Sequence, residues 1–367
     1  MKRFAVIFFG LLILAALAGC GGKKAPAAAG GTAAEGPGKI VFVNSGLGDM
    51  SFNDSGAAGI RALERDYGFK TQVLEVGEDL SKYESFVREA AGDPEVGYVL
   101  ASGTFREAIE SAAASFPDKR FVIFDVGRDT PVAYNNILYV VYAQNEGSYL
   151  VGMVAAEISK SGVIGAVGGV ENPVICDFIT GYIEGARAHK PDIKVATGWV
   201  GNWIDTAAML ELCMSQHNTS AVDVFFPVAG AAGIGAFDAA IALNRGIWTI
   251  GVDSDQYEAL RQSGNTTMAN VIYTSMLKEV GNTFISVFSD LKEGREYWGT
   301  VRTLGVKEKA VGYADNDYFR ANVDPAFLQK LESARDKIAS GEIKVRSYFD
   351  FPNGMSDYNA FVNSVKP

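Results

Sequence analysis

The chain has 367 residues, of which 48% are hydrophobic and 21% are charged, a balance typical of a globular protein with a sizeable core. Asp and Glu number 43 against 33 Lys and Arg, so the net charge of −10 opposes binding to phosphate backbones and to anionic lipid surfaces. Two histidines and two cysteines beyond Cys20 are too few soft ligands for a zinc or iron site. We therefore expect no nucleic-acid partner, no metal and no cofactor.

The first 20 residues have the order of a secretory signal. Lys2 and Arg3 precede an apolar stretch, residues 5–18, which is short for a membrane-spanning helix. The sequence LAGC ending at Cys20 resembles the processing box of bacterial lipoproteins, in which the cysteine becomes the lipidated first residue; an N-terminal anchor helix is the alternative. Residues 21–38 are rich in Ala, Gly and Pro and predict a flexible tether. We expect a lipid-anchored protein at the cell membrane, facing the periplasm or the exterior.

The next part of the chain alternates between strands and helices. The strand at residues 40–43 runs into the glycine-rich sequence GLGDMSFNDS, residues 46–55, which leads into a helix. Such a turn lies at the carboxyl edge of a parallel sheet, where α/β proteins bind ligands. Near-continuous apolar runs follow, as in strands buried on both faces of a parallel sheet. The predicted strands are at 73–76, 96–100 and 121–125, and the predicted helices at 82–91 and 106–115.

A second series of the same kind begins with an amphipathic helix at 146–160. Its predicted strands are at 163–167, 193–196, 222–226 and 247–252. About 330 residues follow the tether, a length that favours two domains. We therefore predict an α/β protein with two doubly wound parallel-sheet lobes and a ligand cleft between them. The expected bounds are 39–143 plus about 256–297 for the N-terminal lobe, 144–255 plus about 298–345 for the C-terminal lobe, and 346–367 for a C-terminal tail.

Two cysteines lie within the second series. Cys176 and Cys213 are free to pair in an oxidising compartment, but sequence alone does not place them within bonding range. Two separate buried thiols are the favoured interpretation.

The glycine-rich motif also contains polar and aromatic candidates. Ser51 with Asp54 has the form of a capping box at the start of a helix, and this is the interpretation that we adopt for Ser51. We expect Phe52 and Asn53 to project into the cleft. Phe52 offers the face of an aromatic ring, and the amide of Asn53 offers a hydrogen-bond donor and an acceptor. Packing of Phe52 in the core is the alternative. Asp49, in the same motif, is a further candidate for ligand binding.

Carboxylates end one strand in each half of the chain. Asp125 follows the strand 121–124, and Asp253 follows the strand at 247–252. Each is either a cap or a ligand acceptor. An ionised carboxylate accepts hydrogen bonds from two adjacent hydroxyls, as in a ribose diol. If the two lobes face each other, these carboxylates converge on a bound molecule.

Three more candidates come from the second half of the chain. Trp203 lies two residues before Asp205, the expected cap of the helix at 206–214, and would sandwich a flat base with Phe52. Trp199 competes for that role, and packing between the lobes is the other possibility. The run AGAAGIG beginning at residue 229 lacks the Lys and Ser/Thr of a phosphate loop, so Gly230 suggests close backbone approach to an uncharged ligand. Lys278, near a helix start, is a ligand contact or a solvated surface residue.

Together these residues resemble the basic membrane lipoprotein family, which includes the purine nucleoside receptors of bacterial ABC uptake systems. The resemblance covers residues 39–345 and is carried by GDMSFN (48–53), EGSYLVG (146–152), GYIEGA (181–186), GVDSDQ (251–256) and TSMLK (274–278). It implies the type I periplasmic binding protein fold, with an ABC permease as partner and a monomeric chain. It also implies roles for single residues: Phe52 stacks on the base, Asn53 and Asp125 bond its polar edge, Trp203 takes the facing aromatic position, and Asp253 with Lys278 holds the ribose hydroxyls.

The leading hypothesis is a substrate-binding lipoprotein that closes two lobes around a purine nucleoside, such as guanosine, inosine or adenosine. Closure follows from a ligand that bridges both lobes. A nucleoside-processing enzyme is the first alternative, because Asp49, Asp125, Asp253 and Asp255 could form an acid cluster, but no nucleophile with a base is recognisable. A surface adhesin or signalling lipoprotein is the second. A lipidated N-terminus without DNA-binding helices excludes a transcription regulator of the same plan.

Overall fold

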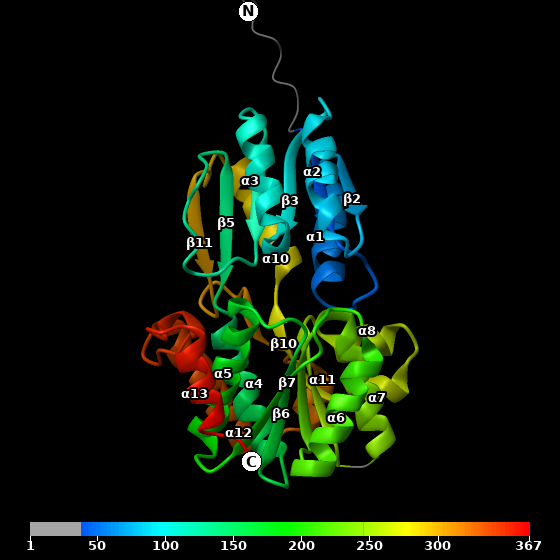
Figure 1. Ribbon diagram of the computed structural model, residues 1–367, viewed down its shortest axis with the longest axis vertical. Helices are drawn as coiled ribbons and strands as arrows, with labels where there is room; N and C mark the ends of the chain where they lie inside the picture. Colours follow the sequence, from blue (N-terminus) through cyan, green and yellow to red (C-terminus); the bar gives the residue numbers. More distant parts are fainter. Residues whose placement is uncertain (1–37, 245) are drawn as a thin grey trace, which may run out of the picture. The chain divides into compact units, whose positions relative to one another are not determined.

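The computed structural model describes residues 38–244 and 246–367 (Figure 1). The expected signal peptide, the expected lipidation site Cys20 and nearly all of the expected tether lie outside these residues. The described residues belong to one compact unit. No helix in this part of the chain is both long and apolar enough to cross a membrane.

The first sheet contains six parallel strands in the order β11-β5-β4-β3-β1-β2. Its central strands are the apolar runs of the sequence, and every residue of β5 is buried. The strands are β1 Lys39–Asn44, β2 Thr71–Glu75, β3 Val96–Ser102, β4 Arg120–Phe124, β5 Ile137–Tyr142 and β11 Thr300–Leu304. The helices of this lobe are α1 Phe52–Tyr67, α2 Tyr83–Gly92, α3 Arg106–Ser115 and α10 Val280–Lys292, with short 3-10 turns at Leu80–Lys82 (η1) and Gly103–Phe105 (η2).

The second sheet also has six strands, in the order β12-β10-β9-β8-β6-β7, and only its edge strand β12 is antiparallel. The strands are β6 Val163–Gly168, β7 Lys194–Trp199, β8 Val224–Val228, β9 Trp248–Asp253, β10 Ile272–Lys278 and β12 Val311–Tyr313. The helices are α4 Gln144–Ile158, α5 Pro173–His189, α6 Thr206–Ser220, α7 Ile234–Leu243, α8 Gln256–Gln262, α9 Thr266–Ala269, α11 Asp317–Asn322, α12 Pro325–Ser340 and α13 Met355–Asn363, with 3-10 turns at Gly230–Gly233 (η3) and Tyr348–Asp350 (η4).

The two sheets repeat one topology. Without the edge strands, β5-β4-β3-β1-β2 corresponds strand by strand to β10-β9-β8-β6-β7. In each sheet the order reverses beside the first strand, and ligands of such sheets bind outside the carboxyl ends of the strands near this point. The expected architecture of two doubly wound lobes is confirmed. By this correspondence β4 in the N-terminal lobe is the counterpart of β9 in the C-terminal lobe.

The chain passes between the lobes at three neighbouring points. The first joins β5 to α4, the second β10 to α10, and the third β11 to β12. Backbone hydrogen bonds link these connections: Ala143 N–H donates to Leu304 O over 2.9 Å, and Glu279 N–H donates to Ala310 O over 2.8 Å. Three adjoining connections are suited to a hinge about which the lobes open and close.

Two strands late in the chain, β10 and β11, lie in the opposite lobes from those expected. The segment at 256–297 was expected in the N-terminal lobe, but β10 pairs in parallel with β9 of the second sheet. Conversely β11, expected in the C-terminal lobe, pairs with β5 of the first sheet. Between them, α10 packs on α1 at a glycine contact, where a Cβ at Gly59 would lie 2.4 Å from the Cα of Gly281. Only glycine permits this close approach of the two helices.

The expected C-terminal tail is also part of the folded unit. Residues 346–367 contain η4 and α13, and both pack on α5 (Figure 1). Val365 O accepts a hydrogen bond from Val195 N–H over 2.9 Å, and the side chains of Val362 and Val365 are buried. The tail interpretation was wrong because these few apolar residues, widely spaced in a polar sequence, still cover the outer face of α5.

Candidate functional site

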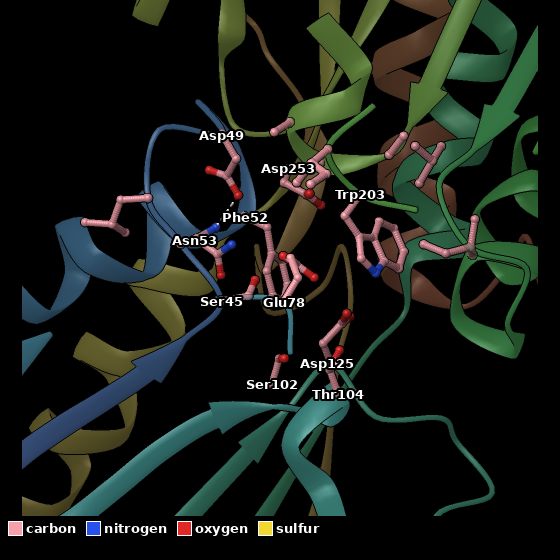
Figure 2. A pocket seen from close by; sticks show the side chains of 18 of the residues that line it. Ser45, Asp49, Phe52, Asn53, Glu78, Ser102, Thr104, Asp125, Trp203 and Asp253 are labelled. Carbon is pink, nitrogen blue, oxygen red and sulfur yellow. Dashed lines mark hydrogen bonds between the residues drawn. The ribbon is translucent and has the colours of Figure 1, made fainter. Parts of the chain in front are cut away.

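A cavity of about 240 Å³ lies between the carboxyl ends of the two sheets. Residues of both lobes line it, and Figure 2 shows side chains reaching it from α1, from the ends of β3 and β4, and from the second lobe. All eight ligand-binding residues expected from the sequence are among them: Asp49, Phe52, Asn53, Asp125, Trp203, Gly230, Asp253 and Lys278. The topology thus brings together side chains that are up to 229 positions apart, from Asp49 to Lys278.

The loop before α1 is held by two carboxylates. Asp49 accepts hydrogen bonds from the backbone N–H groups of Ser51, Asn53 and Asp54 over 2.8–3.1 Å. Burial raises the pKa of Asp49, and the three backbone donors oppose that rise. Asp54 in turn accepts from the N–H groups of Gly48 and Met50. Asp49 therefore caps the helix, and this places Phe52 and Asn53 at its first turn beside the cavity.

The expected capping box at Ser51 is wrong. The Ser51 side chain makes no capping hydrogen bond in α1. Its hydroxyl lies instead 2.9 Å from Asp253 Oδ2 and 3.1 Å from Val252 O, both in the other lobe. The reason is that Asp49, two residues earlier, already binds the free N–H groups of the helix start.

Two aromatic side chains reach the cavity from opposite lobes. Phe52 belongs to α1 and packs against the ring of Phe124, with ring centres 5.4 Å apart. Trp203 belongs to the loop between β7 and α6, and both rings border the cavity in Figure 2. Trp203 lies on Gly169, where a Cβ would come within 2.4 Å of the indole. Trp199 lies on Gly168 and is not among the cavity residues, so Trp203 is the tryptophan at the cleft.

Asp125 and Asp253 occupy equivalent positions in the two lobes. Asp125 follows β4 and Asp253 ends β9, and both have left-handed backbone conformations, with φ of 62° and 64°. This conformation is uncommon for residues other than glycine, and such residues cluster at functional sites. Asp253 is buried, its Oδ2 accepts from Ser51, and its Oδ1 has no hydrogen-bond partner among the described residues. An unpaired buried carboxylate oxygen is available to a ligand donor.

Burial raises the pKa of Asp253 to about 6. The positive charge of Lys278 and the hydroxyl of Ser51 oppose this rise, whereas the negative charges of Asp125 and Asp49 add to it. Asp253 therefore loses its proton only near neutral pH, and its charge depends on its neighbours across the cleft.

Lys278 pairs with Asp125 and acts on Asp253 through its positive charge. It ends β10 with only 1% of its surface exposed, and its Nζ lies 2.5 Å from Asp125 Oδ1 in the other lobe. The ammonium group is also 4.3 Å from the ring centre of Phe178, with Phe52 and Tyr142 farther away at 5.6 and 5.5 Å. The structure thus rejects the solvated-surface interpretation of Lys278. A cation among aromatic faces and one carboxylate is strongly held.

The glycine-rich loop after β8 forms another wall. Gly230 has φ of 54° and begins η3, which continues into α7. Ala229, Gly230 and Ala231 line the cavity, and Ala232 N–H donates to Trp203 O over 2.8 Å. The loop therefore fixes the backbone of Trp203 and offers a small, uncharged surface to a ligand.

Several cavity residues were missed from the sequence. Ser45 follows β1, Ser102 ends β3 and Thr104 lies just after β3, so the strand-end rule that found Asp125 would also have found them. Glu78 comes from the loop after β2, and Phe178 from the middle of α5, where no local pattern separates it from core residues. Asp255, proposed for an acid cluster, caps α8 through Glu258 N–H and accepts from Asn316 Nδ2.

The remaining expectations for this lobe concern a cap and the cysteines. Asp205 accepts from Ala208 N–H and caps α6 as expected. Cys176 and Cys213 are separate free thiols, both buried. Within residues 38–244 and 246–367, no group of three or more His, Cys, Asp or Glu side chains is placed to hold a metal ion.

Residues 39–348 match the family of PnrA-like ABC transporter substrate-binding proteins. The chain belongs to this family. The ABC transporter nucleoside-binding protein BmpA of Lactococcus lactis subsp. cremoris is 30% identical over 95% of this chain and 100% of its own length. Basic membrane protein A of Borreliella burgdorferi is 27% identical, covering 94% of each chain. The resemblance stated from the sequence motifs is thereby confirmed.

Solved structures support the same fold. An ABC transporter solute-binding protein from Aeropyrum pernix K1 superposes with a TM-score of 0.76 at 23% identity, covering 90% of this chain and 97% of the other. A periplasmic solute-binding protein from Actinobacillus succinogenes, determined with bound D-allose, has a TM-score of 0.60 at 17% identity, covering 77% and 99%. The periplasmic-binding-protein fold is therefore confirmed. The protein is the substrate-binding component of an ABC transporter and not an enzyme.

Proposed function

We propose that the protein captures purine nucleosides in the cavity and delivers them to its membrane permease. The observation that carries this proposal is the pair of aromatic side chains, Phe52 and Trp203, that border one cavity from opposite lobes together with two strand-end carboxylates. Aromatic faces suit a flat base, and a carboxylate suits the vicinal hydroxyls of ribose. The name of the 30% identical relative, a nucleoside-binding protein, supports the same ligand class.

The proposal assigns some cavity residues to the base and others to the sugar. Phe52 and Trp203 enclose the base, and Asn53 and Asp125 bond its polar edge. Asp253 Oδ1, which has no partner among the described residues, accepts from a ribose hydroxyl, and Lys278 donates to the sugar from the same lobe. Gly230 permits close approach of the backbone. A ligand held by both lobes favours the closed arrangement, because its contacts are complete only there.

The setting of the protein is part of the proposal. Cys20 is the lipid attachment site, and residues 21–38 link it to the folded unit, so that the protein is held at the membrane surface as a monomer. The 27% identical relatives named basic membrane proteins are consistent with this location. Loss of membrane association in a Cys20→Ser variant, measured by fractionation, is the corresponding test.

We expect tight binding of guanosine, inosine and adenosine, and no binding of cytidine or ribose. The measurement is calorimetric titration of the purified protein after unfolding and refolding, which removes any ligand carried through purification. The base must fill the space between two rings, for which the single ring of cytidine is smaller than a purine, and ribose alone has no base to place there. Absence of heat with every purine nucleoside overturns the proposal, and mass spectrometry of the co-purified small molecule would then identify the ligand class.

Replacing Trp203 by Ala should weaken guanosine binding by about 10- to 100-fold, because a large aromatic contact in an enclosed site carries much of the binding energy. Trp199→Ala is the matched control, since Trp199 belongs to the same segment but is not a cavity residue. We expect its affinity to equal that of the unmodified protein. Equal losses in the two variants would show that Trp203 acts through folding and not through the base.

A further inference from the structure

The two lobes contact each other where the N-terminus of α1 meets the end of β9. Ser51 Oγ lies 2.9 Å from Asp253 Oδ2 and 3.1 Å from Val252 O. Beside it, Ser254 Oγ donates to Met50 O over 2.6 Å. Ser51 has no exposed surface and is not a cavity residue. Two hydroxyls therefore join the lobes behind the cavity wall, one from each lobe.

The Ser51 contact reaches a carboxylate that also lines the cavity. Because Ser51 occupies Oδ2, the oxygen left for a ligand is Oδ1, which has no partner among the described residues. A carboxylate has two oxygens on a rigid plane, so a donor on one of them fixes the direction of the other. The opposite lobe thus orients the oxygen that meets the ligand.

Asp125 receives the reciprocal contact. This carboxylate of the N-terminal lobe accepts from Lys278 of the C-terminal lobe, just as Asp253 of the C-terminal lobe accepts from Ser51 of the N-terminal lobe. The carboxylates end equivalent strands with the same left-handed backbone. Each lobe therefore supplies a donor to the other lobe's carboxylate, and both contacts require that the lobes be closed.

We propose that Ser51 is a positioning residue that couples lobe closure to the orientation and charge of the ligand-binding carboxylate Asp253. The inference rests on the proposed function, because it assigns Asp253 to the ligand. In the open state Asp253 lacks the Ser51 donor and its carboxylate is free to turn. On closure Ser51 donates to Oδ2, directs Oδ1 to the ligand and partly offsets the burial that disfavours the ionised form. The ionised form is the one that accepts a hydrogen bond from a ligand hydroxyl.

The charged groups around Asp253 also affect its pKa. Lys278 on β10 favours its ionised form, whereas Asp125 after β4 and Asp49 before α1 oppose it. The phenol of Tyr142 on β5 is also near enough to interact electrostatically with Asp253. Opening of the lobes would expose Asp253 and separate it from Asp125 and Asp49, which lowers its pKa, whereas loss of the Ser51 hydrogen bond raises it. A rise in the titration midpoint of Ser51→Ala therefore reports the loss of this donor.

The test compares Ser51→Ala with Ser254→Ala. Both variants remove one hydroxyl that joins the lobes, but only Ser51 contacts Asp253. Guanosine affinity is measured between pH 5 and 8, and lobe separation is measured by small-angle X-ray scattering without ligand. For Ser51→Ala we expect about 10- to 100-fold weaker binding at pH 8, the midpoint of the affinity profile higher by about one pH unit, and a more open ligand-free protein. For Ser254→Ala we expect about 3- to 10-fold weaker binding with the midpoint unchanged.

The two measurements separate this inference from the proposed function. If guanosine binds and the two variants have the same midpoint, Ser51 does not position Asp253 and the inference fails while the function stands. If guanosine does not bind the unmodified protein, the nucleoside proposal fails, and the scattering alone decides whether Ser51 holds the lobes closed. Scattering of Ser51→Ala identical to that of the unmodified protein then overturns the inference as well.

Discussion

Replacing Asp253 by Asn should weaken guanosine binding by at least about 100-fold and, at the same time, make the ligand-free protein more stable at pH 8. The loss of affinity follows because a neutral amide replaces an ionised acceptor in an enclosed site, where a charge-assisted hydrogen bond contributes about 1.5–3 kcal/mol. The other proposed contacts with the sugar also depend on this hydrogen bond. Calorimetric titration measures this part of the prediction.

The gain in stability follows from the pKa of Asp253. Its folded pKa of about 6 lies above the usual 3.8, so the folded protein binds this proton more tightly than the unfolded chain does. The stability from this group is therefore complete below pH 3.8 and is lost as the pH rises through about 6. A shift of about two units corresponds to about 3 kcal/mol at most, and Asn, which never ionises, avoids that loss.

Urea unfolding at pH 8 and at pH 4.5 measures the second part. We expect a gain of about 1–3 kcal/mol at pH 8 and a smaller gain at pH 4.5, where Asp253 is already protonated in the folded state. A fall in stability at pH 8 would contradict the account of Asp253 as a destabilising buried charge.

Asp177→Asn is the control for Asp253→Asn. Burial also raises the pKa of Asp177 to about 6, but this carboxylate lies outside the ligand cavity. It accepts from Ser347 Oγ, from Tyr348 N–H and from Gln144 Nε2, three donors that an amide oxygen cannot satisfy equally well. The control should therefore lose stability and keep its guanosine affinity within a few-fold. Burial disfavours the ionised form at both positions, but the three donors around Asp177 make Asn a poor replacement there. At Asp253 no such set of donors among the described residues opposes the replacement.

The sequence predicted which residues line the cleft better than it predicted the bounds of the lobes. Strand ends in a doubly wound fold converge by topology, so Asp125, Asp253 and the motif at Asp49 could be assigned to one cleft without any knowledge of packing. The lobes to which β10 and β11 belong could not be predicted in this way. β10 is a buried strand and β11 is largely exposed, but for both the choice of sheet depends on pairing with β9 or β5 and on the glycine contact between α1 and α10.

Ser51 shows why a local pattern can mislead. Ser-x-x-Asp is a capping signature, but Asp49 was equally able to cap the same helix, and sequence contains nothing that ranks the two. The structure gives the cap to Asp49, and the hydroxyl of Ser51 is left to reach Asp253 from the other lobe. Contacts between lobes bring together residues about 200 positions apart, and no local periodicity encodes them. The same limit explains why Phe178, in the middle of a buried helix, could not be assigned to the cavity or to Lys278.

Replacing Lys278 by Met should destabilise the protein by about 3–5 kcal/mol at pH 8, the largest stability effect that we expect at this site. Met keeps most of the apolar length of the side chain but removes the ammonium group that lies over Phe178, pairs with Asp125 and offsets the charge of Asp253. Removing one partner of a buried ion pair leaves the other charge unpaired, which is far more destabilising than removing both. Urea unfolding measures the change, and Lys160→Met, at an exposed position, should alter stability by less than about 0.5 kcal/mol.

A second substitution distinguishes this explanation from a simple packing defect. In the double variant that combines Lys278→Met with Asp125→Asn, the carboxylate that lost its cation is replaced by a neutral amide. We therefore expect more than half of the lost stability to return. The single variant should also recover stability as the pH falls, because Asp253 then becomes protonated and no longer needs a cation. If the double variant is less stable than Lys278→Met, and stability does not recover at low pH, Lys278 acts through its packing. If both recover, the cation is retained for its charge, which balances two carboxylates contributed by opposite lobes and so favours the closed cleft before any ligand enters.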